Sequence, residues 1–432
     1  MTLDTIFHAF PCQVSRDLEG GATINGKGVM TGAGLGAGLR QEARLLLACA
    51  HTRLEARREA EIRGLVSGLL DWDYLERIAG RHGLRPLLYQ NLGMVCPEAV
   101  PRPLLETQKR GLRSNAIFAM LQSVELIALL KLFEEEGVEA IPYKGPLLGQ
   151  AAYGDAALRE FSDLDILVRP QDVRRAAAAL LRRGYEPAVD LARLPIGLAL
   201  RCGQELAFTR PKGATVDLHW CLTPMTLPAL LDFDAARARL QPANLPGGAV
   251  RTLGPNDLLL SLLFPALRHQ WSSLKWACDF SQVAAGGEVQ WSEVAEQATA
   301  RGYGRVLKVC VLVCRALFDA STPAELLEAA QEDERARKAA ERIVQGAFAE
   351  SNADEEVWAL RCAQAGLLER ARDKARYWAG LFLLPAYPEW AAIRLPRWLF
   401  LLYIPLRPLR LAARYAPQVA KRWGKLTSEY LR

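Results

Sequence analysis

The chain has 432 residues, half of them hydrophobic, and a formal net charge of +6. A chain of this length is too long to form one ordinary hydrophobic core, which favours two or three domains. The charge is uneven, because residues 390–432 hold nine Lys or Arg and one Glu, which leaves residues 1–389 near −2. A nearly neutral body lacks the basic groove that a duplex requires, so the bulk charge argues against a nucleic-acid partner.

Cysteine usage and apolar runs indicate a cytoplasmic protein. The nine cysteines contain no C-x-x-C pair, which is typical of a reducing compartment. No basic segment followed by an apolar stretch stands near the first residue, so we expect no signal peptide. The apolar runs Trp378 to Pro388 and Trp398 to Leu406 have eleven and nine residues, fewer than the ~20 that a membrane-spanning helix needs.

The first third of the chain divides into a glycine-rich start and a helical region. Residues 1–38 carry many glycines and little apolar periodicity, so we expect disorder there. Over residues 39–136, apolar side chains recur at steps of three and four, which predicts helices. The longest of these is expected from Leu104 to Glu136, with Gly137 as its stop.

The period then changes, and residues 137–222 are predicted to form a compact α/β core. Short runs in which apolar and polar residues alternate predict strands. Two segments in which apolar residues recur every three or four positions predict helices between those strands. The expected elements are the strand Val138 to Tyr143, the helix Pro146 to Tyr153, the strand Asp163 to Val168, the helix Gln171 to Arg183, a strand Tyr185 to Val189, and a hairpin of Glu205 to Thr209 with Thr215 to Trp220.

Helical periodicity returns over residues 223–385, and residues 386–432 form a basic, proline-interrupted tail. The segment Arg268 to Asp279 has the spacing of one amphipathic helix, with Lys275 on its polar side. The tail combines arginines with aromatic and leucine residues, which suits either an anionic membrane surface or docking on the body of the protein. We favour docking, because the prolines argue against one long interfacial helix.

The core holds a candidate metal site. Side chains alternate along a strand, so Asp163 and Asp165 share one face, and Asp217 and His219 share a face of the later strand. If these two strands are neighbours, three carboxylates converge, which is how proteins hold the two Mg²⁺ or Mn²⁺ ions of phosphoryl transfer. The alternative is a solvated strand entry whose acids only cap a turn.

Further residues suit a nucleotide at this site. Lys144 and Gly145 precede a predicted helix, where a cationic head and backbone amides meet phosphate groups. Arg159 is either a phosphate contact or a surface residue paired with Glu160. His219 is either a proton carrier or the residue that orients Asp217. Lys275 is a possible second contact of a nucleotide phosphate.

These motifs resemble a known family. The sequence K-G-x-x-L, then Tyr153, then R-x-x-x-D-x-D-I-L-V, then V-D-L-H-W is similar to an uncharacterised bacterial nucleotidyltransferase family of the DNA polymerase beta-like superfamily. The resemblance implies an α+β fold, in which a small mixed-sheet nucleotidyltransferase core is flanked by N-terminal and C-terminal helical regions.

The resemblance also implies an activity and its residues. A nucleoside monophosphate would pass from an NTP to an acceptor, which could be a small molecule, a saccharide or a protein. Asp163, Asp165 and Asp217 would hold Mg²⁺ or Mn²⁺, and Lys144 with Gly145 would contact the triphosphate. The alternative is a non-catalytic nucleotide- or protein-binding module that keeps the fold, because the turn lacks the serine usual in the superfamily.

Overall fold

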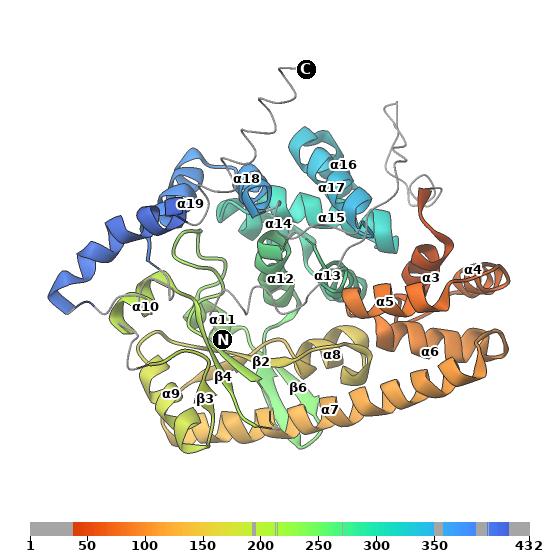
Figure 1. The fold of residues 1–432 in the computed structure, drawn as a ribbon, viewed down its shortest axis with the longest axis horizontal. Helices are drawn as coiled ribbons and strands as arrows, with labels where there is room; N and C mark the ends of the chain where they lie inside the picture. The colour runs from red at the N-terminus through yellow and green to blue at the C-terminus, as the bar shows by residue number, and fades with distance from the viewer. Residues whose placement is uncertain are drawn as a thin grey trace.

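A small mixed β-sheet lies between two sets of helices (Figure 1). The structure, a computed structural model, describes residues 38–191, 196–211, 213, 215–269, 271–349, 357–385, 395 and 397–413. The expected disorder of residues 1–38 falls almost wholly outside this range. Within it, the fold class is α+β, as the sequence indicates.

The N-terminal helices pack around a leucine-rich core, and α5 begins and ends at residues with identifiable roles. Asp71 accepts a hydrogen bond from the Tyr74 amide and so caps α5, and Gly83 ends this helix in the left-handed conformation, which glycine adopts at little cost. These elements are α3 (Gln41–Cys49), α4 (Ala56–Val66), α5 (Trp72–His82), α6 (Arg85–Val95) and the 3-10 turn η2 (Pro97–Ala99).

The 34-residue helix α7 (Arg102–Glu135) connects the N-terminal helices to the sheet. It runs along the lower edge of Figure 1, beneath α6 at one end and the strands at the other. Within the described residues, it is the one helix whose length and composition would allow it to cross a membrane, but 39% of its most apolar window is buried. Core helices of soluble proteins share these properties, so no membrane crossing follows.

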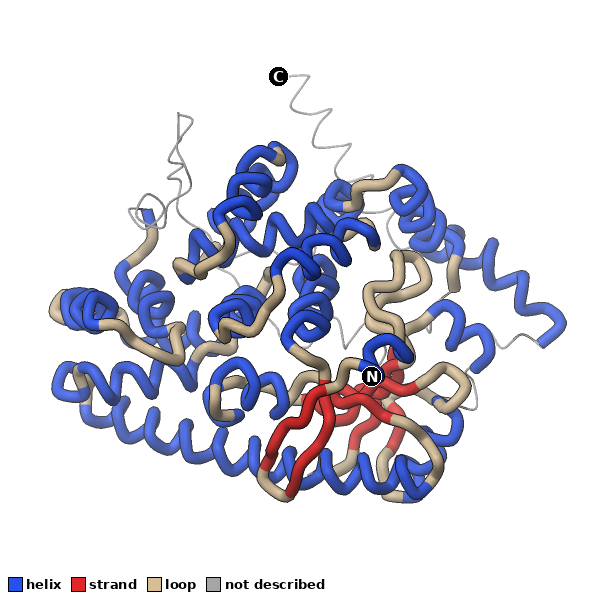
Figure 2. The backbone as a smooth tube through the Cα atoms, turned by 180° about the vertical axis from the view of Figure 1, so that it is seen from behind, coloured by secondary structure: helices blue, strands red, loops and turns tan. Residues whose placement is uncertain are grey.

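The sheet has five strands in the order β1-β2-β5-β4-β3. Strands β2 and β5 are parallel neighbours, whereas the pairs β1–β2, β4–β5 and β3–β4 are antiparallel. Figure 2 shows the strands gathered above α7. The strands are β1 (Ala140–Pro142), β2 (Asp163–Val168), β3 (Glu186–Pro187), β4 (Glu205–Thr209) and β5 (Thr215–His219), and the segments between them form α8 (Pro146–Tyr153), η3 (Ala156–Leu158), α9 (Val173–Arg182) and α10 (Ile196–Cys202).

Each face of this sheet has its own role. Leu164, Ile166 and Val216 point to one side and join a buried cluster with the C-terminal half of α7 and with α9. Alternation therefore turns Asp163, Asp165 and Asp217 to the opposite side. The apolar face fixes the register, because a slip of one residue would bury the acids in that cluster.

A second, two-stranded sheet departs from the expectation of helix throughout residues 223–385. Strands β6 (Gln241–Leu245) and β7 (Gly248–Thr252) form an antiparallel hairpin whose turn contains Pro246 and Gly247. Gly247 has φ of +104°, a conformation that β-hairpin turns commonly require and that glycine adopts without strain. The hairpin is attached to the main sheet by a hydrogen bond of 2.7 Å from Thr252 Oγ1 to the Pro142 carbonyl.

Helices α12 and α13 lie on the acid-bearing side of the sheet, and later helices pack against them. The expectation of one helix from Arg268 to Asp279 is wrong, because the chain turns between α12 and α13, where Trp271 has φ of +54°. Its buried indole holds this break in the core. The helices are α11 (Phe233–Ala238), α12 (Pro255–His269), α13 (Lys275–Ala285), α14 (Trp291–Ala300), α15 (Gly304–Phe318), α16 (Ala324–Glu332), α17 (Glu334–Gly346), α18 (Val357–Leu367) and α19 (Ala371–Leu383).

Part of the basic tail lies against the body. The turn η4 (Arg397–Leu402) leads into a helical segment over 403–413. Tyr403 is buried with the sheet cluster, and Arg407 Nε donates to the Leu381 carbonyl at 3.1 Å. Leu401 and Leu409 remain exposed. Residues 386–394 and 414–432 of the tail are outside the described residues.

Candidate active site

Two acids and a histidine meet where β2 and β5 run side by side. The parallel register sets Asp165 opposite Asp217 and Leu167 opposite His219. One ligand atom from each of Asp165, Asp217 and His219 lies within 4.8 Å of the others. The structure thus brings together two of the three acids proposed as metal ligands, and adds His219 to their cluster.

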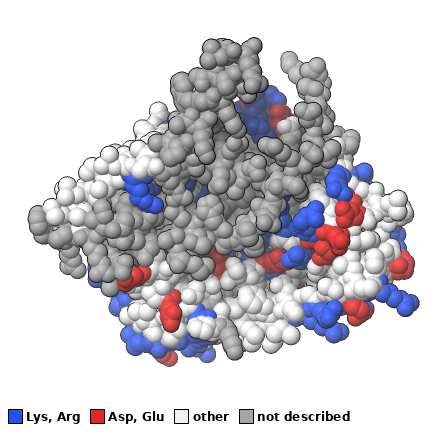
Figure 3. Space-filling view, in the orientation of Figure 1, with Lys and Arg blue, Asp and Glu red and all other residues white. Residues whose placement is uncertain are grey.

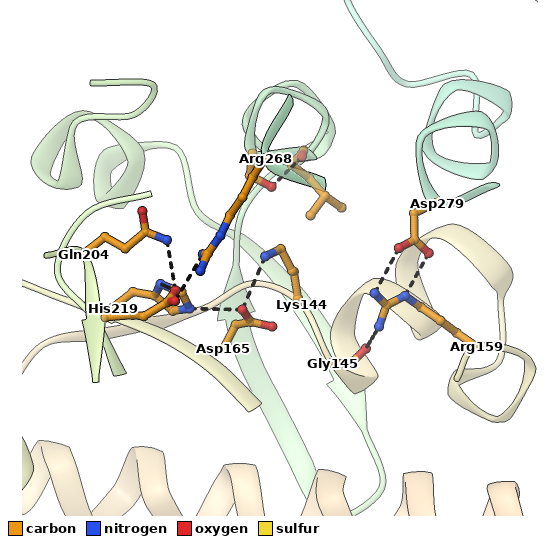
Figure 4. Close-up of polar contacts among 11 residues, drawn as sticks. Lys144, Gly145, Arg159, Asp165, Gln204, His219, Arg268 and Asp279 are labelled. Carbon is orange, nitrogen blue, oxygen red and sulfur yellow. Dashed lines mark hydrogen bonds and ion pairs between the residues drawn. The ribbon is translucent and has the colours of Figure 1, made fainter. Parts of the chain in front are cut away.

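Asp165 is the best-paired of the acids. Its Oδ1 lies 3.3 Å from Lys144 Nζ and 3.1 Å from His219 Nε2 (Figure 4). Burial opposes its ionisation, but Lys144 and the hydrogen bond with His219 outweigh that cost and hold the pKa of Asp165 well below its usual range. Asp165 is therefore a carboxylate at neutral pH. Burial lowers the pKa of His219, but its contacts with Asp165 and Glu205 outweigh burial and raise this pKa.

The pKa values of Asp217 and Asp163 are raised, in the opposite direction to the pKa of Asp165. Burial, followed by the charge of Asp163, raises the pKa of Asp217 to about 8. Burial and then the charge of Asp165 raise the pKa of Asp163. Like charges held close together disfavour ionisation, and a cation between them reverses the effect.

The donor set fits a divalent cation. Asp165 and Asp217 supply the carboxylate oxygens that Mg²⁺ and Mn²⁺ prefer, and a His219 nitrogen lies beside them. The raised pKa of Asp217 is the effect expected of clustered carboxylates without such an ion. Asp163 lies on the same strand face as Asp165, two residues earlier, at the edge of this cluster.

Lys144 and Gly145 form a tight turn beside the acids. Gly145 precedes the first residue of α8 and has φ of +55° and ψ of −130°, which an L-residue adopts only with strain. A Cβ at this position would lie 3.0 Å from the Asp163 carbonyl oxygen. The turn therefore approaches β2 closely, and Lys144 directs its ammonium group onto Asp165. The predicted phosphate-binding turn and the predicted acids occupy one site.

Arg159 does not have the exposed position expected for it. Its side chain is 4% exposed and pairs with the fully buried Asp279 of α13, with Nε–Oδ1 and Nη2–Oδ2 distances of 2.8 and 2.9 Å. Nη1 also donates to the Gly145 carbonyl at 3.5 Å, and Tyr153 donates its hydroxyl to Asp279 Oδ1 at 2.7 Å. Arg159 is not the surface partner of Glu160, and its contacts position the turn at Gly145.

Lys275 lies at the first residue of α13, on the acid-bearing side of the sheet. Burial and then the charge of Arg159 lower the pKa of Lys275, whereas Asp279, Asp163 and Glu160 oppose that shift. The helix break before it thus brings a second ammonium group into the field of the Asp163 carboxyl. Its proposed contact with a nucleotide phosphate stays a prediction.

The sequence did not predict the polar residues that contact His219 on the side away from Asp165. Glu205, which pairs with His219 across β4 and β5, has its Oε2 3.4 Å from His219 Nδ1. Arg268 Nη1 donates to Glu205 Oε1 at 3.1 Å, and Gln204 Nε2 donates to Oε2 at 3.0 Å (Figure 4). Although burial opposes it, Arg268 lowers the pKa of Glu205 to about 2. A glutamate at the start of a predicted strand was the available signal, but its partner on α12 was not predictable from spacing.

Known structures resemble the fold only in part. A lincosamide antibiotic adenylyltransferase, LnuA with lincomycin bound, is 19% identical and covers 32% of this chain and 82% of its own, with a TM-score of 0.23. An antigenic nucleotidyltransferase-like protein from Paracoccidioides brasiliensis is 14% identical and covers 46% of this chain and 96% of its own, with a TM-score of 0.27. At these TM-scores, neither supports an argument about the site.

The family comparison is more extensive. No curated protein matches the chain. The family model described as uncharacterised nucleotidyltransferase matches residues 69–319, more than half of the sequence. This range holds the N-terminal helices from α5, the sheet with its acids, and the helices through α15. The chain therefore belongs to the uncharacterised nucleotidyltransferase family.

Proposed function

We propose that the protein is a metal-dependent nucleotidyltransferase that moves a nucleoside monophosphate from an NTP to an acceptor. The observation that carries the proposal is the meeting of Asp165 and Asp217 on parallel neighbouring strands beside the Lys144–Gly145 turn. Family membership supports the reaction class. The metal dependence, the roles of single residues and the placement in the DNA polymerase beta-like superfamily are parts of the proposal.

Each residue of the site has a task in this reaction. Asp165 and Asp217, with Asp163, would hold Mg²⁺ or Mn²⁺. A bound divalent ion would offset the charge that develops on the α-phosphate. Lys144 binds the triphosphate, and the Gly145 turn places that lysine at the start of α8.

The reaction forms one bond and breaks one. An acceptor oxygen attacks the α-phosphorus, the bond to the bridging oxygen of the β-phosphate breaks, and pyrophosphate leaves. The acceptor loses a proton as it attacks. We assign this proton to the carboxylate of Asp217, which faces Asp165 across the parallel strand pair. His219 and Glu205 hold Asp165 in place throughout.

One observation favours the alternative of a non-catalytic binding module. Lys144 already pairs with Asp165, which also contacts His219, so the site has an internal cation. In that case, Lys144 would keep its contact with Asp165 when a nucleotide or protein binds.

Labelled nucleotides distinguish these functions. The full chain is incubated with Mg²⁺, candidate acceptors and NTPs labelled on the α- or the γ-phosphate. We expect label to pass to an acceptor from the α position alone. Transfer from the γ position would identify a kinase, and nucleotide binding without transfer would favour the binding module.

A further inference from the structure

A separate cavity lies between the N-terminal helices and α7. Its volume is about 640 Å³, within the range of small-molecule sites. Helices α5, α6 and α7 form most of its wall, and Glu160 closes the side toward the sheet. The residues that matter here are Glu76, Arg85, Tyr89, Asn115, Phe118 and Glu160.

The wall presents several hydrogen-bond acceptors beside the donor groups of Arg85 and Ser114. Glu160 is half-buried and has no ion pair within 4.0 Å among the described residues. Asn115 donates its amide nitrogen to the Ala157 and Arg159 carbonyls, so the group it has left for a ligand is its oxygen. Tyr89 donates its hydroxyl to Glu76 and can still accept. A ligand that satisfies the acceptors of Glu160, Asn115 and Tyr89 must therefore bring several donors of its own.

The cavity also has an apolar side. Phe118 lines it and packs against the buried Phe161, with ring centroids 5.4 Å apart. Arg85 is the one cationic residue on the wall, and its Nε lies 3.9 Å from Glu76 Oε2. A ring-shaped molecule with hydroxyl or amino groups at its edge matches an aromatic face beside a rim of acceptors.

The cavity is close enough to the acids to serve the same reaction. Glu160 precedes Asp163 by three residues, which span at most about 11 Å of extended chain. The charge of Lys275 acts on both carboxyl groups. The Lys275 side chain also packs at Gly83, just before α6, where an added Cβ would meet its Cδ at 3.2 Å. Lys275 therefore lies at the junction between the cavity and the acids.

We propose that this cavity is the acceptor site and that it takes a saccharide, a hydroxyl-rich molecule of one or two rings. Glu160 accepts hydrogen bonds from its hydroxyl or amino groups, and Phe118 supplies the apolar face. A hydroxyl at the far end of the ligand then reaches the α-phosphate beside Asp163. The acceptor role rests on the proposed function, whereas the binding itself does not.

Binding is tested with the full chain, without nucleotide or metal. Glucosamine, N-acetylglucosamine and cellobiose are titrated by saturation-transfer NMR. Ser114→Trp fills the cavity from the α7 side, and Ala116→Trp adds the same ring to an exposed position of α7 that does not line it. We expect at least one saccharide to bind the wild type and Ala116→Trp equally, and Ser114→Trp at least tenfold more weakly.

Glu160→Gln tests the chemistry and does not depend on the fit of a large ring. This substitution keeps the shape of the side chain and removes its charge. It should therefore weaken the binding of glucosamine, which carries an ammonium group, at least threefold more than the binding of N-acetylglucosamine. The proposal is overturned if no saccharide binds, or if Ser114→Trp binds saccharides as tightly as the wild type does. It is also overturned if Glu160→Gln changes the affinities for the two sugars by the same factor.

Transfer of α-label, measured in parallel, separates the two proposals. Saccharide binding that Ser114→Trp abolishes, together with no transfer by any variant, would reject the nucleotidyltransferase proposal and retain the cavity as a saccharide site. Transfer to an acceptor at the same rate by Ser114→Trp and the wild type would reject the cavity and retain the reaction.

Discussion

Asp165 is the residue on which the site depends, because it contacts Lys144 and His219 and faces Asp217 across the parallel strand pair. Although burial opposes it, the charge of Lys144 and the hydrogen bond with His219 keep Asp165 ionised inside the protein. Asp217 faces the opposite situation, since its neighbours include Asp163 and Asp165. Two similar carboxyl groups thus have opposite pKa shifts, which assigns them different tasks.

Asp165→Asn should abolish nucleotidyl transfer while the fold is retained. The amide keeps the size of the side chain but loses the charge that would hold a metal, an interaction of several kcal/mol in the transition state. We expect a loss of at least about a hundredfold in kcat/KM, since each factor of ten is about 1.4 kcal/mol. Asp73→Asn, at an exposed position of α5, is the control. Unreduced transfer by Asp165→Asn would remove this residue from the site.

Asp217→Asn should change how stability depends on pH. The pKa of Asp217 is raised from its usual 3.8 to about 8 in the folded state, so between these values the folded protein binds more protons than the unfolded chain. The free energy of unfolding of the wild type therefore falls as pH rises from about 4 to about 8. Asparagine does not titrate, so the variant should lack this decrease.

The measurement is urea unfolding in EDTA at pH 5, 7 and 9. As pH rises, the free energy of unfolding of the variant should increase relative to that of the wild type. The relative increase at pH 9 should be about 1.4 kcal/mol or more, which is the equivalent of one pKa unit. A stability difference that does not change with pH would contradict the raised pKa. Saturating Mg²⁺ should stabilise the wild type more than the variant.

At the scale of elements, the contact between α13 and the chain after α8 holds the Lys144–Gly145 turn. Arg159, which follows η3, reaches both Asp279 on α13 and the carbonyl of Gly145. Figure 4 shows this pair on one side of the turn and Asp165 with Lys144 on the other. The turn is thus fixed from a helix that lies more than a hundred residues later in the chain.

Asp279→Ala should cost about 3–5 kcal/mol of unfolding free energy, because it leaves the Arg159 charge buried without a partner. Chemical denaturation measures this loss. The double variant Arg159→Met with Asp279→Leu should recover much of it. Glu341→Ala, which breaks the partly exposed pair with Arg337, should cost less than about 1 kcal/mol. Equal effects of the two single variants would show that the buried charge is not the cause.

Gly145→Ala should be more harmful than Gly154→Ala, although both glycines have positive φ, +55° and +75°. Alanine at either position is strained by roughly 1 kcal/mol or more. At Gly145 its Cβ would also lie 3.0 Å from the Asp163 carbonyl, whereas at Gly154 no atom lies within 4 Å. Thermal melts give the two stabilities, and NTP titrations should show weakened binding for Gly145→Ala alone. Equal losses at both positions would mean that the close approach to β2 is unimportant.

At the scale of the whole molecule, the sheet supplies the acids, and segments beside its acid-bearing face supply cations. Arg268 and Lys275 come from the break between α12 and α13, and Lys144 comes from the turn before α8. The face drawn in Figure 3 carries Lys or Arg and Asp or Glu side chains intermixed over its described helices. The cations of the site therefore come from three separate segments of the chain.

A metal and a nucleotide together should stabilise the whole chain. A ligand at one hundred times its dissociation constant adds about 2.7 kcal/mol to the free energy of unfolding. We expect Mg²⁺ with the preferred NTP to raise Tm, and EDTA to remove most of the increase. Asp165→Asn should show no such metal-dependent increase. An increase with NTP that EDTA leaves unchanged would favour a binding module without a metal.

The sequence by itself determined the local features of this protein. The bounds of β2, β4 and α8 follow from residue periodicity and from the turn residues beside them, and the period of two set Asp163 and Asp165 on one face. These features depend on neighbours along the chain, so a single sequence contains them. The hairpin β6–β7 was missed even so, because its strands are short, mostly exposed and weak in alternation.

Only the tertiary structure decided which of these features meet. It made β2 and β5 parallel neighbours, so that Asp165 faces Asp217, and it buried Arg159 against Asp279, 120 residues away. It also broke the helix at Trp271 and so brought Arg268 to Glu205. Strand order, buried ion pairs and helix breaks depend on packing between distant segments, which the periodicity of a single segment does not encode.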